Sequence, residues 1–310
     1  MLVGAASGFG LVILLFVRRI RLFSVPRIEH LLNLRPLAHI PLSESEEQVA
    51  AGFCPLNKLP KHDPMCEAYR SLRTAVEGQL GQSDRGRILI ISSAEQGEGK
   101  TFTTINVATV FAWQYPKVLL IDADLRKPSL TRRAIGDPAK TRGFLQYLQG
   151  ETDDWKSLAL RNEESKLDIL PAGPASSHAA ELLQSERVAR MFEEMRREYE
   201  FIIIDTAPIN AVVDTILLSK YADGLALVMV PGKTRIPSLQ YALSRIPSTR
   251  VLGYVANRLT SSSRTYYSYY GRDSYYGRGQ YYGSLYGYGY YGKRGYYGKP
   301  SKTDGDQSES

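Results

Sequence analysis

A glycine-rich loop that could bind phosphate spans residues 94–101, where the chain reads Ala-Glu-Gln-Gly-Glu-Gly-Lys-Thr. It follows an apolar run and precedes a helical pattern, which is the context that a nucleotide phosphate loop requires. Gly97 and Gly99 would let backbone N–H groups turn toward phosphate oxygens, and the start of the next helix would add a favourable dipole. Lys100 would reach the β- and γ-phosphates, and the Thr101 hydroxyl would bind Mg²⁺. A chance glycine-rich turn is the alternative, but the lysine, the threonine and both flanking elements in register argue against it. The residues expected to contact the nucleotide here are Ala94, Gln96, Gly97, Glu98, Gly99, Lys100, Thr101 and Phe102.

Three aspartates at the ends of apolar runs complete the predicted site. Asp205 ends the run 201–204, and Asp122 and Asp124 follow the run 118–121. Because the carboxyl ends of parallel strands line the ligand crevice, these side chains should lie beside the phosphate loop. One carboxylate of the Asp122–Asp124 pair could orient Mg²⁺ or its water, and the other could accept a proton from an attacking hydroxyl. Helix capping is the alternative role for an aspartate at such a position. The predicted metal ligands are Thr101, Asp122 and Asp205, and the predicted catalytic residues are Lys100, Asp122, Asp124 and Asp205.

The last fifty residues hold fourteen tyrosines, mostly in Tyr-Tyr pairs and Tyr-Gly steps. A nucleotide-binding domain followed by many phenolic hydroxyls suggests an enzyme attached to its own substrate. The candidate phosphate acceptors are Tyr266, Tyr267, Tyr269, Tyr270, Tyr275, Tyr276, Tyr281, Tyr282, Tyr286, Tyr288, Tyr290, Tyr291, Tyr296 and Tyr297.

The elements that must position these residues alternate between strand and helix. Continuous apolar runs predict strands at 88–91, 118–121, 167–170, 201–204, 225–230 and 251–256. Helices are predicted at 64–80, near 100–113, and at 179–197, 211–219 and 238–245. This order indicates an α/β fold with a mostly parallel, doubly wound sheet covered on both faces.

The N-terminus is apolar from Leu2 to Val17 and then basic at Arg18, Arg19 and Arg21. A secretory signal would carry its positive charge before the apolar run, so this order favours a transmembrane helix with the rest of the chain in the cytoplasm. An amphipathic or buried core helix is the alternative. The two cysteines, Cys54 and Cys66, lack company at metal-ligand spacing, which favours free thiols in a reducing compartment.

Composition divides the 310 residues into four parts. Residues 1–23 are the predicted transmembrane helix, and 24–63 form a proline-rich juxtamembrane linker with an acidic patch at 43–47. Residues 64–260 form the nucleotide-binding domain. Residues 261–310 are rich in Tyr, Gly, Ser and Arg, a composition that cannot bury a core and predicts disorder.

Three motifs in this order resemble those of the bacterial tyrosine kinases: the phosphate loop, Asp-x-Asp-Leu-Arg-x-Pro from Asp122, and Ile-Ile-Asp-Thr-x-Pro around Asp205. These kinases are the cytoplasmic domains of polysaccharide co-polymerases of capsule and exopolysaccharide assembly. Segments 28–41, 67–73 and 252–258 are also similar to the family's juxtamembrane segment, its Glu-x-x-Arg-x-x-Arg helix and its last strand.

The resemblance implies a P-loop NTPase fold and a non-specific protein-tyrosine kinase that uses ATP and Mg²⁺. It further implies autophosphorylation of the tyrosine cluster in trans, ring-like homo-oligomers through Glu67, Arg70 and Arg73, and adenine contact by Asn257. Without the resemblance, the alternative is that these three residues form a charged, solvent-exposed face of the helix. The implied partners are a transmembrane activator or co-polymerase and a phosphotyrosine phosphatase, at the inner (plasma) membrane as a single-pass protein. Nucleic acid is not an expected partner.

Two departures from the family's pattern are present. Gln96 stands where the family usually has proline, which should slightly change the rigidity of the loop. Full co-polymerases also have an extracytoplasmic domain and a first transmembrane helix before the span, and we expect these to be on another protein or missing from this sequence.

Two other classes of function fit parts of the sequence. ParA/MinD-like ATPases share the sheet and motifs, but they carry a second lysine early in the loop, where this chain has Glu95. Alternatively, the tail could bind RNA or polysaccharide by stacking, or drive condensation.

The charge of the tail suggests a switch. Residues 264–299 carry six basic residues and one aspartate, a net charge of about +5. Such a segment would suit an acidic ATP site on a neighbour, and accumulated phosphate would then loosen the ring.

Overall fold

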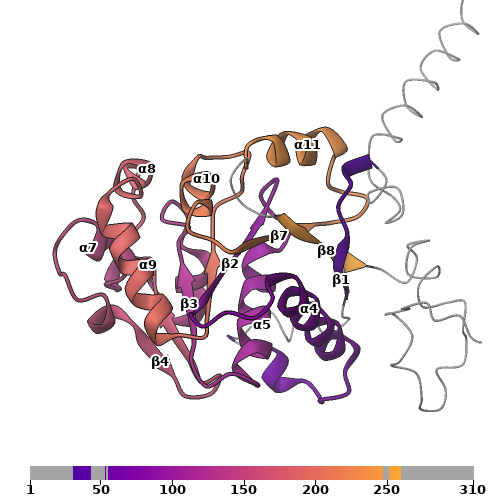
Figure 1. Ribbon diagram of the computed structural model, residues 1–310, viewed down its shortest axis with the longest axis horizontal. Coiled ribbons are helices and arrows are strands. Elements are labelled where there is room, and N and C mark those ends of the chain that lie inside the picture. Colours follow the sequence, from indigo (N-terminus) through magenta and orange to yellow (C-terminus); the bar gives the residue numbers. More distant parts are fainter. Residues whose placement is uncertain (1–30, 43–52, 54, 247–250, 260–310) are drawn as a thin grey trace, which may run out of the picture. The chain divides into compact units, whose positions relative to one another are not determined.

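Eight strands form one sheet in the order β1-β8-β7-β2-β6-β3-β5-β4 (Figure 1). The computed structural model describes residues 31–42, 53, 55–246 and 251–259. All neighbouring strands pair in parallel except β4 and β5, which are antiparallel. The strands are β1 (Pro36–Pro41), β2 (Arg87–Ser93), β3 (Val118–Asp122), β4 (Leu160–Asn162), β5 (Leu167–Leu170), β6 (Phe201–Asp205), β7 (Gly224–Met229) and β8 (Val251–Leu259).

Helices cover the two faces of this sheet (Figure 1). The α-helices are α4 (Pro64–Leu80), α5 (Lys100–Ala112), α6 (Ser129–Ala134), α7 (Phe144–Leu148), α8 (Ala179–Leu182), α9 (Glu186–Glu198), α10 (Asp214–Ser219) and α11 (Ile236–Ser244). The short 3₁₀ helices are η1 (Pro55–Lys58), η2 (Pro138–Lys140) and η3 (Lys156–Leu158).

The central strands are apolar without interruption because both of their faces are buried. In β2, for example, Ile88 and Ile90 belong to the core beneath α9, α10 and α11. Leu89 and Ile91 belong to the core beneath α4 and α5. Successive side chains of a strand point to opposite faces and therefore belong to two different cores. This explains why these strands carry almost no polar residue before their carboxyl ends.

Helix α4 begins at the residue that the sequence indicates. The Asp63 side chain accepts a hydrogen bond from the backbone N–H of Met65 at 2.8 Å, and Pro64 occupies the first turn, where its missing N–H is not needed. Its buried face, which includes Tyr69, Leu72 and Val76, packs on the sheet. The predicted helix 64–80 is confirmed.

The six predicted strands and the mostly parallel sheet are confirmed, with boundaries that differ by a few residues. Residues 36–41, expected in the linker, form the edge strand β1 against β8. The predicted helix 179–197 is wrong as one element: it divides into α8 and α9, because Ser185 adopts an extended conformation between them.

Two predicted parts of the chain lie outside the described residues, namely the transmembrane helix 1–23 and the tail 261–310. Within the described part, no helix is both long enough and apolar enough to cross a bilayer.

If β1 is an integral part of the sheet, its buried residues must contribute to stability. Ile40 is 1% exposed in β1, whereas Leu42, just beyond the strand, is 40% exposed. We expect Ile40→Ala to lower the free energy of unfolding by about 2–5 kcal/mol, and Leu42→Ala by less than about 1 kcal/mol. Chemical denaturation measures both, and equal small effects would show that residues 36–41 behave as a linker.

Candidate active site

The phosphate loop between β2 and α5 has the backbone that its glycines allow. Gly97 has φ 81° and Gly99 has φ 90°, both in the left-handed region that favours glycine. A Cβ on Gly99 would also overlap the side-chain amide of Asn257. Among the described residues, the backbone N–H groups of residues 97–102 donate no hydrogen bond, so they remain available to an anion at the start of α5.

Residues distant in sequence hold this loop in place. The Glu98 side chain is 1% exposed, accepts from the Glu95 N–H at 2.9 Å and also accepts from the Thr234 hydroxyl. The Asn257 amide donates to the Glu98 carbonyl at 3.0 Å, and the Lys233 ammonium donates to the Gly97 carbonyl at 3.3 Å. Burial raises the pKa of Glu98. Sequence reasoning missed Thr234 and Lys233, because nothing near them in the sequence marks a contact with the loop.

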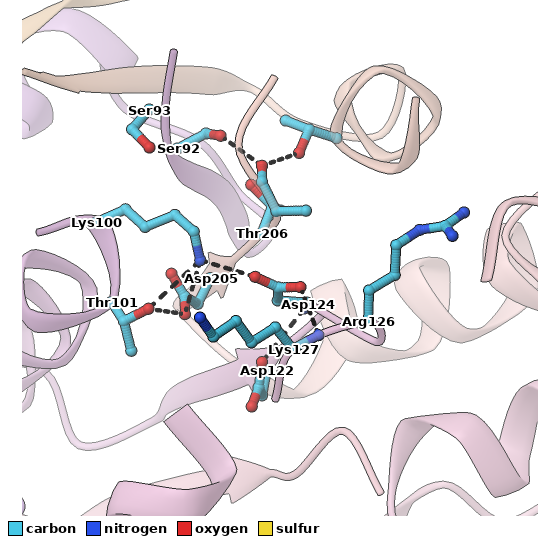
Figure 2. A network of polar contacts seen from close by, with 12 residues as sticks. Ser92, Ser93, Lys100, Thr101, Asp122, Asp124, Arg126, Lys127, Asp205 and Thr206 are labelled. Carbon is cyan, nitrogen blue, oxygen red and sulfur yellow. Dashed lines mark hydrogen bonds and ion pairs between the residues drawn. The ribbon is translucent and has the colours of Figure 1, made fainter. Parts of the chain in front are cut away.

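Two carboxylates, those of Asp124 and Asp205, pair with Lys100 beside the loop, and the carboxylate of Asp122 lies next to them (Figure 2). Asp122 and Asp205 face each other in the register of β3 and β6. The Lys100 ammonium lies 3.0 Å from an Asp124 oxygen and 3.8 Å from an Asp205 oxygen. The Thr101 hydroxyl donates to Asp205 at 2.7 Å. The structure therefore brings together all of the predicted catalytic residues.

The two carboxylates of the Asp-x-Asp motif have different surroundings. Asp122 is completely buried, and one oxygen accepts from the N–H and the hydroxyl of Thr131, both at 2.7 Å. Its other oxygen accepts from the Asp124 N–H at 3.2 Å. Asp122 therefore also has, in part, the alternative role of helix capping, because the Thr131 N–H that it accepts from lies in the first turn of α6. Asp124, by contrast, lines the cleft in front of the loop.

The site fits a divalent cation bound together with phosphate. Three buried carboxylates face one ammonium, so negative charge is in excess if all of them ionise. Burial, together with the charge of Asp205, raises the pKa of Asp122 to about 7, and burial also raises the pKa of Asp205. Hydroxyl and carboxylate oxygens such as those of Thr101 and Asp205 are the ligands that Mg²⁺ prefers. In the described part of the chain, no group of three His, Cys, Asp or Glu side chains is arranged to hold a metal ion by itself.

A cleft of about 530 Å³ opens at the loop. From the predicted nucleotide contacts it is lined by Gln96, Gly97, Gly99, Lys100, Thr101 and Phe102. The side chains of Ala94, Glu98 and Asn257 are buried behind the loop, at no more than 3% exposure. Adenine contact by Asn257 stays a prediction.

The lining of this cleft corrects the expectation of an acidic ATP site. Asp124 is its one acidic lining residue. Its basic lining residues are Lys100, Arg126, Lys127, Arg132, Arg133 and Arg258. The expectation failed because these residues come from three separate segments and converge only in the folded chain, whereas Asp122 and Asp205 are buried beneath them.

Comparison with known proteins assigns the family. Residues 86–242 match the AAA domain family. Tyrosine-protein kinase YwqD of Bacillus subtilis is 37% identical over 208 residues, which cover 66% of this chain and 86% of that protein. The chain belongs to the family of bacterial tyrosine-protein kinases.

Two further relatives extend this comparison. The BceF tyrosine kinase domain superposes with a TM-score of 0.67 at 26% identity, covering 77% of this kinase and 99% of that domain. The succinoglycan biosynthesis transport protein ExoP of Rhizobium meliloti is 33% identical over 242 residues. That alignment covers 74% of this kinase but only 30% of ExoP, so the kinase spans less than a third of this relative.

The predicted oligomer contacts on α4 are engaged within the kinase. Arg73 donates to the Val110 carbonyl at 2.9 Å and so joins α4 to α5. Arg70 pairs with Glu67, and its guanidinium lies 5.2 Å from the centre of the Trp113 ring. The side chains of Glu67 and Arg70 remain about 30% exposed and that of Arg73 remains 17% exposed, and contact of all three residues with a second copy stays a prediction.

Gly99 offers a sharp test of the loop. Gly99→Ala should lower the affinity for an ATP analogue at least about tenfold, because the new methyl group meets the Asn257 amide in a strained backbone. Gly78→Ala in α4 is the matched control, since a Cβ there meets nothing within 4 Å. Calorimetric titration of both variants with the ATP analogue measures the two affinities. An unchanged affinity in Gly99→Ala would contradict nucleotide binding by this loop.

Proposed function

We propose that this kinase transfers the terminal phosphoryl group of Mg-bound ATP to the C-terminal tyrosines of a second copy of the chain. One observation carries the proposal: Lys100, Asp124 and Asp205 meet at the mouth of a phosphate loop, in a chain with fourteen tyrosines in its last fifty residues. The specificity for tyrosine rests on the family and on this acceptor cluster.

Each residue of the site has a role that its surroundings support. The loop amides and the Lys100 ammonium would hold the phosphates, and Thr101, Asp122 and Asp205 would hold Mg²⁺ directly or through its waters. Asp122, which is buried and accepts three hydrogen bonds, would also fix the position of the cluster. Bound ATP would supply the phosphoryl group, and Mg²⁺ would offset negative charge of the carboxylates and the phosphates.

Asp124 is the carboxylate best placed to act as the general base, because it alone among the three lines the cleft. Transfer joins the γ-phosphorus to the phenolic oxygen, breaks the bond to the departing ADP and leaves the phenolic proton on Asp124. Lys100 must exchange partners during this cycle, since the ammonium that reaches phosphate is the one that Asp124 binds here.

The contacts of Glu95 argue against the alternative hypothesis that the protein is a ParA/MinD-like ATPase. Its carboxylate accepts from Arg235 of the same chain at 3.1 Å, and its pKa is lowered by hydrogen bonds from Ser238 and Arg235. This loop position therefore presents a negative charge bonded within the chain, where those ATPases extend a lysine to a partner's nucleotide.

The wider setting follows from the relatives. ExoP is named a succinoglycan biosynthesis transport protein, and we accordingly infer a role in exopolysaccharide or capsule synthesis and export. In this proposal, residues 1–23 anchor the kinase in the inner membrane, 24–63 link that anchor to the cytoplasmic domain 64–260, and 261–310 are the substrate tail. A transmembrane activator, ring-like assembly and a phosphatase that removes the phosphates complete the cycle.

Lys100→Met tests the activity itself. The full chain incubated with Mg-ATP should acquire phosphotyrosine in the tail, and the variant should lose it, because no other cation of the loop reaches the phosphates. Lys156→Met, which changes an exposed lysine outside the cleft, should keep wild-type labelling. Tryptic mass spectrometry locates the phosphates. ATP turnover without phosphotyrosine would favour the ATPase, and nucleic-acid binding with neither activity would favour a binding module.

Asp124→Asn separates proton acceptance from nucleotide binding. Phosphotyrosine formation should fall at least about 10²-fold, since the general base is lost. The affinity for an ATP analogue should change less than about fivefold, because the loop amides and Lys100 remain. Asp153→Asn, at an exposed ion pair with Arg187, is the matched control. A loss of affinity as large as the loss of transfer would show that Asp124 binds nucleotide instead.

A further inference from the structure

A group of exposed cations beside the active site has no acidic partner among the described residues. Lys127, Arg132 and Arg133, here called the basic rim, line the cleft and are exposed. None of them forms an ion pair with a carboxylate of the described residues. Arg126 differs, since it pairs with Asp214 at 2.9 Å, and Figure 2 shows its side chain directed away from the carboxylates.

The fold holds the basic rim next to the general base. Lys127 follows Asp124 by three residues, and its N–H donates to the Asp124 carboxylate at 3.0 Å. Thr131, beside Arg132 and Arg133 on α6, is fixed by its bonds to Asp122 and by the Ala172 N–H at 2.9 Å. The same carboxylates that organise the site therefore also place the basic rim at its entrance.

The charge of the tail indicates what the basic rim binds. Before phosphorylation, residues 264–299 carry a net charge of about +5, which such a rim repels. Within them, residues 279–292 hold six tyrosines and no charged residue. Each phosphate adds roughly −1.5 to −2 and three strong acceptor oxygens, which are suited to arginine.

We propose that the basic rim binds phosphotyrosine of an already phosphorylated tail, presented by a second copy of the chain. The inference rests on the proposed function and adds the preferred substrate: a tail that already carries phosphate. A docked phosphate holds a neighbouring unmodified tyrosine near Asp124, so the first transfer is slow and later transfers are faster. Phosphorylation then initially strengthens contact between copies, in contrast to the loosening that an acidic site would give.

Peptide binding tests this without requiring transfer. The probes are a capped, fluorescent peptide of residues 279–292 and the same peptide with phosphate on Tyr286. Phosphatase-treated full chain, without nucleotide, should bind the phosphopeptide at least about tenfold more tightly than the unmodified peptide. The combined variant Lys127→Gln, Arg132→Gln, Arg133→Gln should lose this preference. Arg85→Gln, Arg161→Gln, Arg190→Gln, a charge-matched triple of exposed residues outside the cleft, should keep it.

Several results would overturn the inference. These are equal affinity for the two peptides, equal phosphopeptide affinity in the rim variant and the wild type, or rim-dependent binding of phosphatidylserine vesicles without phosphopeptide binding. Intact-mass analysis of the autophosphorylation time course gives an independent measure. Wild type should show unmodified chains beside heavily phosphorylated ones, and a random distribution would contradict priming while leaving tyrosine transfer itself established.

Discussion

Buried negative charge at the carboxyl ends of β3 and β6 is the constraint on which this structure depends. Burying a carboxylate is costly unless it is paired and hydrogen-bonded. Here Lys100 and the hydroxyls of Thr101, Thr104 and Thr131 compensate three carboxylates only in part. Burial raises the pKa values of both Asp122 and Asp205, and a bound Mg²⁺ ion can offset the negative charge of these carboxylates when they ionise. The buried carboxylates that favour Mg²⁺ binding therefore also lower the stability of the folded protein.

The position of the phosphate loop depends on residues in or next to β7 and β8, toward the β1 edge of the sheet. The phosphate loop is held by Thr234, which follows β7, and by Asn257 at the end of β8. β8 is itself covered at its outer edge by β1. Residues 36–41, predicted as part of a linker, therefore complete the sheet that supports the phosphate loop. Substitutions that destabilise β1 should also disturb the active site.

Much of this arrangement could be predicted because the signals are local. Unbroken apolar runs end in Asp122 and Asp205, and the phosphate loop has its glycines and lysine within eight residues. β1 was missed because prolines flank a short, partly polar strand whose partner is more than 200 residues away. Contacts such as Thr234 with Glu98 leave no trace in the local sequence.

The charge of the cleft could not be predicted for the same reason. Basic residues at 126–133 and 258 meet only after folding, and they turn an entrance expected to be acidic into a basic one. Asp122 and Asp124, whose roles are left open by their spacing, are both buried, but Asp122 is enclosed by Thr131 whereas Asp124 lines the cleft. This difference is the reason for proposing Asp124 as the general base.

Mixing two full-length chains of different mass tests the central claim most directly. One carries Lys100→Met with its natural tail, and the other has an intact loop but phenylalanine at all fourteen tail positions. With Mg-ATP, phosphotyrosine should form on the tail of the first chain, and Asp205→Asn in the second chain should abolish it. Absence of phosphotyrosine from the first chain, or transfer that is insensitive to Asp205, would contradict the account.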